Sequence, residues 1–373
     1  MRVVVLTGGT SAEREICLKS GAKVMAALDP ARYDAVAVDL AEITGPRADE
    51  IASLMWREPK ALTSKVSPAE EAEAPALKAA GPPGGTGLQP VPQNDQGVRN
   101  VEMPSPQDRG RQSAPDVVFI AIHGGAGENG TVQGMLDLLG IPYVGSGVLA
   151  SAMALNKVVA KKLFEREGIP TPKWIAVKAS RRAGAAARIV AELGLPCVVK
   201  PVSEGSSIGV TIVREEPQLE PALDLAFRYG PEVLVEEFIR GVEITGPVLG
   251  NDDPEVLPLI EIVPSQQYEF YDYEAKYTPG ATEEIIPARI PEAWAQRARE
   301  LTLAAHQALG CRGMSRVDMI VGPDDVYVIE LQTIPGLTDT SLVPRAAEAA
   351  GIPFPKLVDR LIELALEGRE RHG

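Results

Sequence analysis

The pattern of hydrophobic and polar positions at the start of the chain predicts the first unit of a doubly wound α/β sheet. Residues 1–7 form a nearly continuous apolar run that is followed by Gly8 and Gly9. Ser11 is a suitable N-cap for a helix over residues 12–28, and residues 35–40 have the composition of a further strand. A strand, a glycine turn and a helix in this order are typical of the opening of such sheets.

The same kind of pattern returns after residue 115. Residues 116–122 form an apolar run that predicts a buried strand, and it ends in the segment HGGAGENG, residues 123–130. A helix is expected over 131–139. A short strand over 141–144 and one long helix over 149–167 are expected to follow.

Residues 168–243 alternate between strand and helix patterns and predict a compact α/β unit. The expected elements are strands at 174–177, 197–201, 209–213 and 232–237, and helices at 181–193 and 217–228. The segments expected after this unit are mixed strands, an acidic-aromatic loop at 268–284, a helix at 292–309, a hairpin and a C-terminal helix at 355–367.

Residues 58–114 interrupt the alternation of strands and helices. Pro, Gly, Ala, Gln and Ser dominate there, and the stretches GPPGGTG, PVPQND and PSPQDRG have neither helical nor strand periodicity. This composition predicts an insert that is largely disordered or poorly packed, with a functional lid as the alternative.

The hairpin is expected within residues 314–336, MSRVDMIVGPDDVYVIELQTIPG, where two apolar runs flank the turn sequence GPDD. Alternation along a strand places Arg316 and Asp318 on one face of the first strand, and Glu330 and Gln332 on one face of the second. If Asp318 pairs with Glu330, all four side chains share a face. That register requires a loop of three or five residues, because a loop of four would separate the two pairs.

Oxygen donors on such a face predict a magnesium site. Two carboxylates and an amide oxygen are ligands that suit Mg²⁺, which also keeps water and phosphate oxygens in its coordination shell. The alternative is a solvated face on a half-exposed sheet. Because Asp and Glu are depleted in strands, their position inside these apolar runs favours the magnesium site.

Composition narrows the class of function. The net charge of −14 argues against a protein that binds a nucleic-acid backbone. No run of eighteen apolar residues exists, and the first apolar run reaches glycine too soon for a signal peptide, so no membrane association is expected. Three scattered cysteines indicate a reducing cytoplasm, and three histidines make a His-rich zinc site improbable.

Two further segments contain candidate residues for phosphate and purine binding. Lys200 ends an apolar strand and precedes the glycine-serine segment 203–209, whose backbone N–H groups could cover phosphates, although hairpin turns use the same residues. The segment VLVEEFIRGVE, residues 233–243, ends an apolar strand in two carboxylates followed by Phe and Ile. Taken alone, that segment favours a strand leading into an exposed turn over a purine slot.

Several separated motifs together identify a family. They are GGTSAERE, HGGAGENGTVQG, IPYVGSGVLASA, KPVSEGSSIGV, VEEFIRGVE, FYDYEAKY, RVD and ELQTIPGLTDTS. In this order they resemble the D-alanine–D-alanine ligases of the ATP-grasp superfamily, over residues 1–56 and 116–367. FYDYEAKY and the combination of GGTSAERE with HGGAGENG are specific to these ligases, whereas RVD with a Glu-x-Gln pair is shared more widely in the superfamily.

The resemblance implies an α/β (α+β) class, three-domain ATP-grasp fold with a Rossmann-like N-terminal domain. The expected domains are residues 1–147, which would bind the first amino acid, 148–236, and 237–373, which would carry the metal site and the second amino-acid site. ATP would lie between the last two. The implied reaction is ATP-dependent ligation of two D-alanines in bacterial peptidoglycan precursor synthesis, by a cytoplasmic enzyme that is commonly a homodimer.

The resemblance also implies roles for individual residues. The residues that would contact ATP are Lys157, Lys200, Ser207, Gly209, Glu236, Glu237, Ile239 and Glu243. The metal ligands for two Mg²⁺ ions, with Mn²⁺ as a substitute, would be Asp318, Glu330 and Gln332. The catalytic group would comprise Glu13, Ser206, Tyr277, Arg316 and Gly336, and the substrate-binding group His123, Lys276 and Ser341. Tyr277 would link to Ser206 and Glu13 as a latch, and Glu13 would hold the ammonium of the first D-alanine.

This sequence departs from the family pattern at a few positions. Gln332 stands where Asn is usual, Asn129 and Asn156 stand where Asp is usual, and Cys17 replaces a serine. Three functions therefore remain open: a D-alanine–D-alanine ligase, a related ligase that uses D-lactate or D-serine as acceptor, and a nucleotide-binding protein without turnover. Tyr277 favours an amine acceptor, and Gln332 is the support for the third function.

Overall fold

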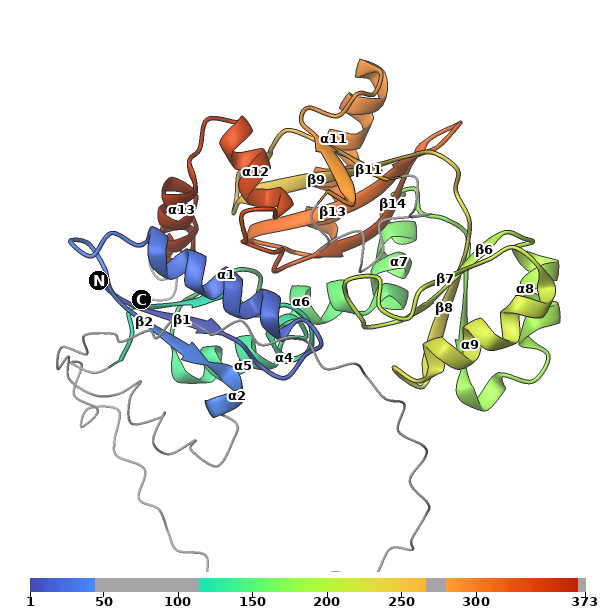
Figure 1. Cartoon of the computed structure of the whole chain (residues 1–373), viewed down its shortest axis with the longest axis horizontal. Coiled ribbons are helices and arrows are strands. Elements are labelled where there is room, and N and C mark those ends of the chain that lie inside the picture. Colours follow the sequence, from blue (N-terminus) through green and yellow to red (C-terminus); the bar gives the residue numbers. More distant parts are fainter. Residues whose placement is uncertain (44–113, 266–279, 368–373) are drawn as a thin grey trace, which may run out of the picture. The chain divides into compact units, whose positions relative to one another are not determined.

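The computed structural model describes residues 1–43, 114–265 and 280–367, which belong to one compact unit. Three β-sheets with helices against them make up this part of the chain (Figure 1). The expected insert lies outside the described residues apart from Ala114, and so does the loop that carries Lys276 and Tyr277. The end of the expected loop 268–284 is a strand, β12 (Thr282–Ile285).

The N-terminal sheet is parallel, as its continuous apolar strands predict. Its order is β2-β1-β3-β4. The strands are β1 (Arg2–Thr7), β2 (Asp34–Asp39), β3 (Val117–Ile120) and β4 (Tyr143–Val144). Helix α1 (Arg14–Ala27) follows the glycine turn after β1 and confirms the helix expected over 12–28, but its N-cap is Glu13 and not the expected Ser11. The turn carries positive φ angles at Gly8 and Gly9, which glycine adopts readily.

The second sheet is antiparallel and has the order β5-β8-β6-β7. Its strands are β5 (Trp174–Lys178), β6 (Cys197–Pro201), β7 (Thr211–Val213) and β8 (Glu232–Glu237). Helices α8 (Ala185–Glu192) and α9 (Leu219–Phe227) bury Ile189 and Leu223 against these strands. The strand and helix alternation expected for residues 168–243 is confirmed.

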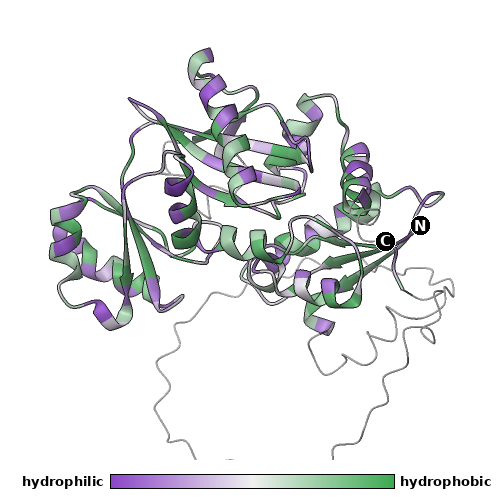
Figure 2. Ribbon diagram, turned by 180° about the vertical axis from the view of Figure 1, so that it is seen from behind, coloured by the Kyte–Doolittle hydropathy of each residue, from purple (hydrophilic) through white to green (hydrophobic). Residues whose placement is uncertain are grey.

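The third sheet has the order β12-β11-β9-β13-β14, with β10 paired to β9. Besides β12, its strands are β9 (Val242–Gly250), β10 (Glu255–Val256), β11 (Ile260–Pro264), β13 (Gly313–Val321) and β14 (Val326–Gln332). Helix α11 (Glu292–Ala308) lies against β9, β13 and β14 and buries Ala298, Leu301 and Ala305 (Figure 1). The central strands β9 and β13 are largely hydrophobic, as expected for strands with most of their side chains buried (Figure 2).

The connecting helices agree with the sequence pattern over 131–139 and 355–367 but differ from it over 149–167. They are α2 (Leu40–Ile43), α4 (Gly125–Glu128), α5 (Thr131–Leu139), α6 (Val148–Leu155), α7 (Lys157–Arg166), α12 (Leu342–Ala349) and α13 (Phe354–Glu367). The single helix expected over 149–167 is therefore wrong. Asn156 lies between α6 and α7 with an extended backbone, and its Oδ1 accepts a hydrogen bond from Val159 N–H at 3.1 Å. This N-cap separates the two helices.

The largest core is shared between the ends of the chain. Val5 and Phe119 of the N-terminal sheet belong to one buried cluster with Leu357 and Leu361 of α13. The same cluster continues to Met314 of β13. The C-terminal helix is thus packed against the N-terminal sheet, beside α1 (Figure 1). Among the described helices none has both the length and the apolar character that a membrane span requires.

Candidate active site

The β13–β14 hairpin has the register that brings its polar side chains together. Asp318 pairs with Glu330, and Arg316 pairs with Gln332. The loop between Val321 and Val326 nevertheless has four residues, so the expectation that such a loop would separate the polar pairs is wrong. A register shift after Asp318 pairs Met319 with Val328 and leaves Ile329 as an extra residue. This β-bulge returns the polar side chains to one face.

Arg316 and Asp318 form a bidentate ion pair on that face. Arg316 Nε donates to Asp318 Oδ1 at 2.8 Å, and Arg316 Nη2 donates to Oδ2 at 2.6 Å. Thr245 Oγ1 of the neighbouring strand β9 donates to Asp318 Oδ1 at 2.7 Å. Arg316 is only 9% exposed. The carboxylate is thereby fixed in orientation at the edge between two pockets.

Glu330 lies beside a lysine from the start of α7. Lys157 Nζ is 3.1 Å from Glu330 Oε2 and donates to Glu204 O at 2.7 Å. Gln332 Nε2 lies 3.5 Å from Glu330 Oε1. The Asn156 N-cap holds the first turn of α7 at this point, so replacing the family's usual Asp by Asn keeps a capping acceptor.

A buried triad of charges lies behind this face. Glu236 on β8 forms ion pairs with Lys161 of α7 through Oε1 and with Lys200 of β6 through Oε2. Lys161 also donates to Thr171 Oγ1 at 2.5 Å. Burial alone would raise the pKa of Glu236, but the two lysines lower it below its usual value, whereas burial lowers the pKa of Lys161. Because Lys161 is fully buried and binds Glu236, it fixes the carboxylate against which Lys200 rests.

One pocket, with an empty volume of ≈ 940 Å³, gathers most of the residues expected to contact ATP. Its lining includes Lys157, Lys200, Ser207, Glu236, Glu237, Ile239, Glu243, Asp318 and Glu330. Apolar side chains such as Phe238, Met319 and Ile320 line it as well. A pocket that combines apolar walls with lysines and carboxylates suits a purine joined to phosphates.

The loop that joins β6 to β7 reaches over both pockets. Ser206 and Ser207 have φ angles of 49° and 57°, a left-handed conformation that non-glycine residues rarely adopt. Gly209, expected in the ATP site, does not line the pocket; at φ 70° a Cβ there would lie 2.8 Å from Pro201 Cγ. Gly209 thus shapes the loop and leaves its contact with a nucleotide untested.

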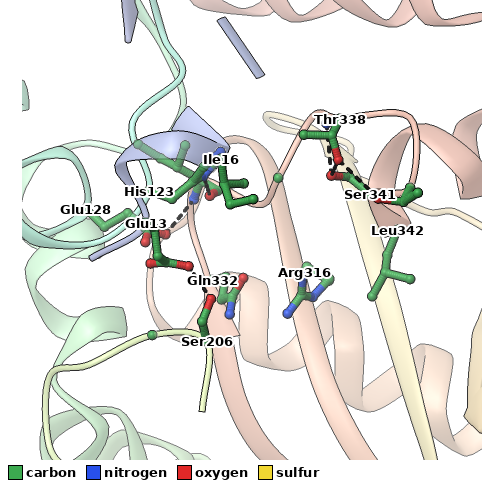
Figure 3. Close-up of a pocket in the computed structure, with 14 residues that line it drawn as sticks. Glu13, Ile16, His123, Glu128, Ser206, Arg316, Gln332, Thr338, Ser341 and Leu342 are labelled. Atoms are coloured by element: carbon green, nitrogen blue, oxygen red, sulfur yellow. Dashed lines mark hydrogen bonds between the residues drawn. The ribbon is translucent and has the colours of Figure 1, made fainter. Parts of the chain in front are cut away.

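A second pocket, of ≈ 640 Å³, gathers the residues expected to bind the amino acids. Glu13, His123, Ser206, Arg316, Gln332, Gly336 and Ser341 line it. Glu13 and Ser206 point toward one another and are hydrogen-bonded, whereas Arg316 comes from the opposite wall (Figure 3). Two of the three members of the expected latch are therefore in contact, and Tyr277, like Lys276, lies outside the described residues.

The far end of this second pocket is the turn before α12. Ser341 occupies the N-cap position of that helix and its Oγ accepts from Thr338 N–H at 2.9 Å (Figure 3). A Cβ on Gly336 would lie 2.7 Å from Ser341 Oγ, so glycine is needed there for this close approach. A free helix N-terminus with a serine is a favourable place for a carboxylate.

Glu128 is a buried carboxylate that lines the second pocket and that sequence reasoning missed. Oε2 accepts from Gly124 N–H at 2.6 Å, and Oε1 accepts from Ile334 N–H at 3.2 Å. Burial, reinforced by the nearby charge of Glu13, raises the pKa of Glu128 to about 7. Its position in the glycine-rich segment after a buried strand was the one available signal, since such turns present side chains at the ends of strands.

We expect Glu128 to make the protein less stable as the pH rises. Its folded pKa lies above the value of an unfolded carboxyl group, so stability from this group is complete below about pH 4.5 and is lost as the pH passes about 7, by on the order of 3 kcal/mol. Glu128→Gln cannot ionise and removes this dependence. Urea unfolding of the apoprotein between pH 5 and 7.5 should show the wild type losing stability relative to the variant; a constant difference would contradict the assignment.

The side-chain oxygens on the hairpin are of the chemical type that magnesium ions prefer as ligands. Asp318 and Glu330 supply carboxylates beside the Gln332 amide, and Mg²⁺ is usually bound through one or two carboxylates together with phosphate oxygens. Over residues 1–43, 114–265 and 280–367, no group of three or more His, Cys, Asp or Glu side chains could hold a metal ion. Besides these two carboxylates, the amide, the substrate phosphates and water would supply ligands.

Other residues that support the site were not singled out from the sequence. They are Ser20, Lys161 and Thr245, which contact His123, Glu236 and Asp318 respectively. Lys161 could have been found from its spacing, since residues i and i+4 of a helix share a face and Lys157 is the expected phosphate contact. Ser20 and Thr245 carry no such signal, because their partners are distant in the sequence.

Known protein families and relatives match this chain over most of its length. The family described as D-ala D-ala ligase N-terminus matches residues 2–146, and that described as D-ala D-ala ligase C-terminus matches residues 163–363. The D-alanine–D-alanine ligase of Syntrophobacter fumaroxidans is 44% identical over 368 residues, which cover 98% of each chain. The alignment therefore extends across residues 58–114, which the motifs that carry the resemblance do not cover.

Two solved structures are similar over almost their entire length, and their ATP-grasp fold is that of the present chain. The D-alanine–D-alanine ligase of Bacillus anthracis complexed with ATP is 30% identical, with a TM-score of 0.72 and full coverage of both chains. The VanG D-Ala:D-Ser ligase of Enterococcus faecalis is 31% identical, with a TM-score of 0.72 and coverage of 98% and 99%. Together with the two pockets and the hairpin between them, these likenesses lead to one conclusion: the chain belongs to the D-alanine–D-alanine ligase family.

Proposed function

We propose that the protein ligates two molecules of D-alanine at the expense of ATP, giving D-alanyl-D-alanine, ADP and phosphate. The observation that carries the proposal is the position of Arg316 and Asp318 on the boundary between a pocket suited to a nucleotide and a pocket suited to an amino acid. Relatives that are named as such ligases, one of them in complex with ATP, support the same reaction.

The reaction would proceed in two steps through an acyl phosphate. A carboxylate is a poor electrophile, so its oxygen first attacks the γ-phosphorus of ATP and ADP leaves. The amine of the second D-alanine then attacks the activated carbonyl carbon, the amide bond forms, and phosphate departs with the oxygen of the former carboxylate. Positioning and neutralisation of charge contribute most of the catalysis in such phosphoryl transfers.

Within the nucleotide pocket, Lys157 and Lys200 would contact the phosphates. Ser207 and the backbone N–H groups of its loop would cover them, while Glu236, Glu237 and Ile239 would contact the adenine and Glu243 the ribose. Mg²⁺, held by Asp318, Glu330 and Gln332 as one or two ions, would neutralise phosphate charge, and Mn²⁺ would substitute for it.

In the amino-acid pocket, different residues would bind the ammonium group of the first D-alanine and the carboxylate of the second. Glu13, held by Ser206, would bind the ammonium of the first D-alanine. Ser341 and the N-terminus of α12 would bind the carboxylate of the second D-alanine. Arg316 would stabilise the negative charge that develops on the transferred phosphoryl group and on the tetrahedral intermediate, with Gly336 leaving room beside it. Lys276 and Tyr277 would close the site against water.

A related ligase with a different acceptor is the second candidate. Its support is the likeness to the VanG D-Ala:D-Ser ligase, which is as similar in structure as the ATP-bound relative. Incubation with ATP, Mg²⁺ and single or paired amino acids, followed by measurement of ADP, separates the candidates. Release with D-alanine alone supports the first, release only when D-serine or D-lactate is added supports the second, and nucleotide binding without release indicates a protein without turnover.

Gln332 provides a mutational prediction for the metal site. Its side chain is one methylene longer than that of Asn, which displaces the amide oxygen by roughly 1.5 Å. We expect Gln332→Asn to keep or increase kcat and to lower the Mg²⁺ concentration at half-maximal rate. Titration of Mg²⁺ at saturating ATP measures this, and a large loss of activity would argue against the amide as a ligand.

The family resemblance also suggests a cytoplasmic homodimer in peptidoglycan precursor synthesis. Leu138 of α5 and Leu149 of α6 are 91% and 70% exposed on neighbouring helices, and an apolar surface of this kind fits a second copy of the chain. Sedimentation of the double variant Leu138→Glu/Leu149→Glu tests this surface. We expect a dimer in the wild type and a monomer in the variant; an unchanged mass would reject this surface as the interface.

A further inference from the structure

Both polar backbone groups of Ile334 are held by side chains of the segment HGGAGENG. His123 Nδ1 donates to Ile334 O at 2.8 Å, and Ile334 N–H donates to Glu128 Oε1 at 3.2 Å. Ile334 follows β14 and lies more than 200 positions away in the sequence. Two side chains from the N-terminal part of the chain therefore hold one residue of the loop after the hairpin by hydrogen bonds to its carbonyl and its N–H.

A serine of α1 holds the same loop three residues further along, at Leu337. Ser20 Oγ lies 3.0 Å from His123 Nε2, and Leu337 N–H donates to Ser20 Oγ at 3.3 Å. The second oxygen of Glu128 accepts from Gly124 N–H at 2.6 Å. We call Ser20, His123 and Glu128 the loop clamp. Their exposed fractions are 0%, 4% and 7%, so each bond in the clamp is shielded from water.

The direction of each hydrogen bond in the clamp is determined by its partners. Ile334 O can only accept, so His123 Nδ1 carries the proton. Burial lowers the pKa of His123, and the neutral ring then leaves Nε2 as an acceptor for the Ser20 hydroxyl. Ser20 Oγ keeps a lone pair for Leu337 N–H. Both ring nitrogens of His123 are thus engaged by groups of the protein itself.

The clamped loop forms one wall of the amino-acid pocket. Ile334 and Gly336 line that pocket, and the chain continues from Leu337 to Thr338, which is hydrogen-bonded to Ser341 at the start of α12. Glu13 lines the same pocket at the end away from Ser341 (Figure 3). The separation of Glu13 from Ser341 therefore depends on how firmly residues 334–337 are held to the N-terminal sheet.

We propose that Ser20, His123 and Glu128 are positioning residues that set the geometry of the amino-acid pocket through the loop 334–337. The inference rests on the proposed function, because it needs an amino acid as the ligand of this pocket. It gives His123 a role through Ile334, in place of the substrate contact that the family resemblance implies. Because the clamp residues do not line the nucleotide pocket, their loss should affect the amino acid and spare ATP.

The test compares His123→Leu, which removes both hydrogen bonds, with His123→Asn, whose side-chain N–H lies near the position of Nδ1. His306→Leu is the matched control: His306 is 1% exposed and bonded through Nδ1 to Ser315 Oγ at 2.8 Å, but it lines neither pocket. For His123→Leu we expect KM for D-alanine to rise about 10-fold or more and KM for ATP to change less than about two-fold. His123→Asn should recover most of the loss, and His306→Leu should leave both KM values unchanged.

An unchanged KM for D-alanine in His123→Leu, or an equal rise in both KM values, would overturn the positioning role. If His123→Leu does not fold, Glu128→Gln takes its place. The amide nitrogen of Gln must face either Gly124 N–H or Ile334 N–H, so one of the two hydrogen bonds of Glu128 is lost. The same changes in KM for D-alanine and for ATP then decide the positioning role. A wild-type protein that releases no ADP with D-alanine would overturn the proposed function as well. An active wild type with unaffected clamp variants would overturn this inference alone.

Discussion

Arg316→Lys should lower kcat by about 100- to 1,000-fold, the usual effect of removing one preorganised donor from a site of developing charge. Lysine keeps the positive charge but loses the planar pair of N–H groups that fixes Asp318 at 2.8 and 2.6 Å. Binding of ATP should change much less, because the lysines of the nucleotide pocket are intact. Steady-state rates of ADP release and nucleotide titration of the same preparation measure the two quantities.

Arg289→Lys is the matched control for this variant. Arg289 forms a similar bidentate pair with Glu261, with both bonds at 2.9 Å, but neither residue lines the two pockets. We expect it to retain at least half of the wild-type kcat, since exposed ion pairs contribute about 1 kcal/mol or less to stability. If Arg316→Lys were as active as Arg289→Lys, Arg316 would have no role in the chemical step.

Glu330→Ala should reduce turnover by on the order of 100-fold or more, because it removes one of the two hairpin carboxylates that would hold the magnesium ion. The substitution also leaves Lys157 without the carboxylate that now lies 3.1 Å from its Nζ. Higher Mg²⁺ should restore part of the rate if the loss comes from weakened metal binding. The rate measured across a Mg²⁺ series, with ATP saturating, is the direct readout.

Glu261→Ala provides the comparison here, since it removes a strand carboxylate with an arginine partner from the same sheet. It should leave the Mg²⁺ dependence of the rate unchanged. Turnover by Glu330→Ala at the wild-type level would count against the metal assignment, whatever the behaviour of the control.

Much of the fold could be predicted because apolar periodicity is a local property. The run before Gly8 and the pattern over 12–28 led to β1 and to α1 (Arg14–Ala27), and the alternation along the hairpin led to a shared face for Asp318 and Glu330. Polar residues at the ends of apolar strands also pointed to Lys200 and the segment 203–209, whereas Glu13, His123 and Ser341 came from the family resemblance. The inferences from periodicity need only the direction of side chains along one element.

Other features depend on contacts that no local pattern records. The bulge at Ile329 reversed the conclusion drawn from loop length, because an extra residue in one strand has no compositional signature. The division of α6 from α7 at Asn156 was missed because a helix-capping side chain is also tolerated within a helix. The buried roles of Glu128 and Lys161 arise from partners on other elements, which only the folded chain brings together.

The transfer of oxygen from substrate to phosphate tests the central claim most directly. If the carboxylate of D-alanine attacks ATP at the boundary of the two pockets, D-alanine labelled with ¹⁸O in its carboxylate must deliver one labelled oxygen to each phosphate formed. Mass spectrometry of the released phosphate gives the answer. We predict phosphate with one ¹⁸O from the labelled substrate, and unlabelled phosphate formed together with the dipeptide would contradict the account.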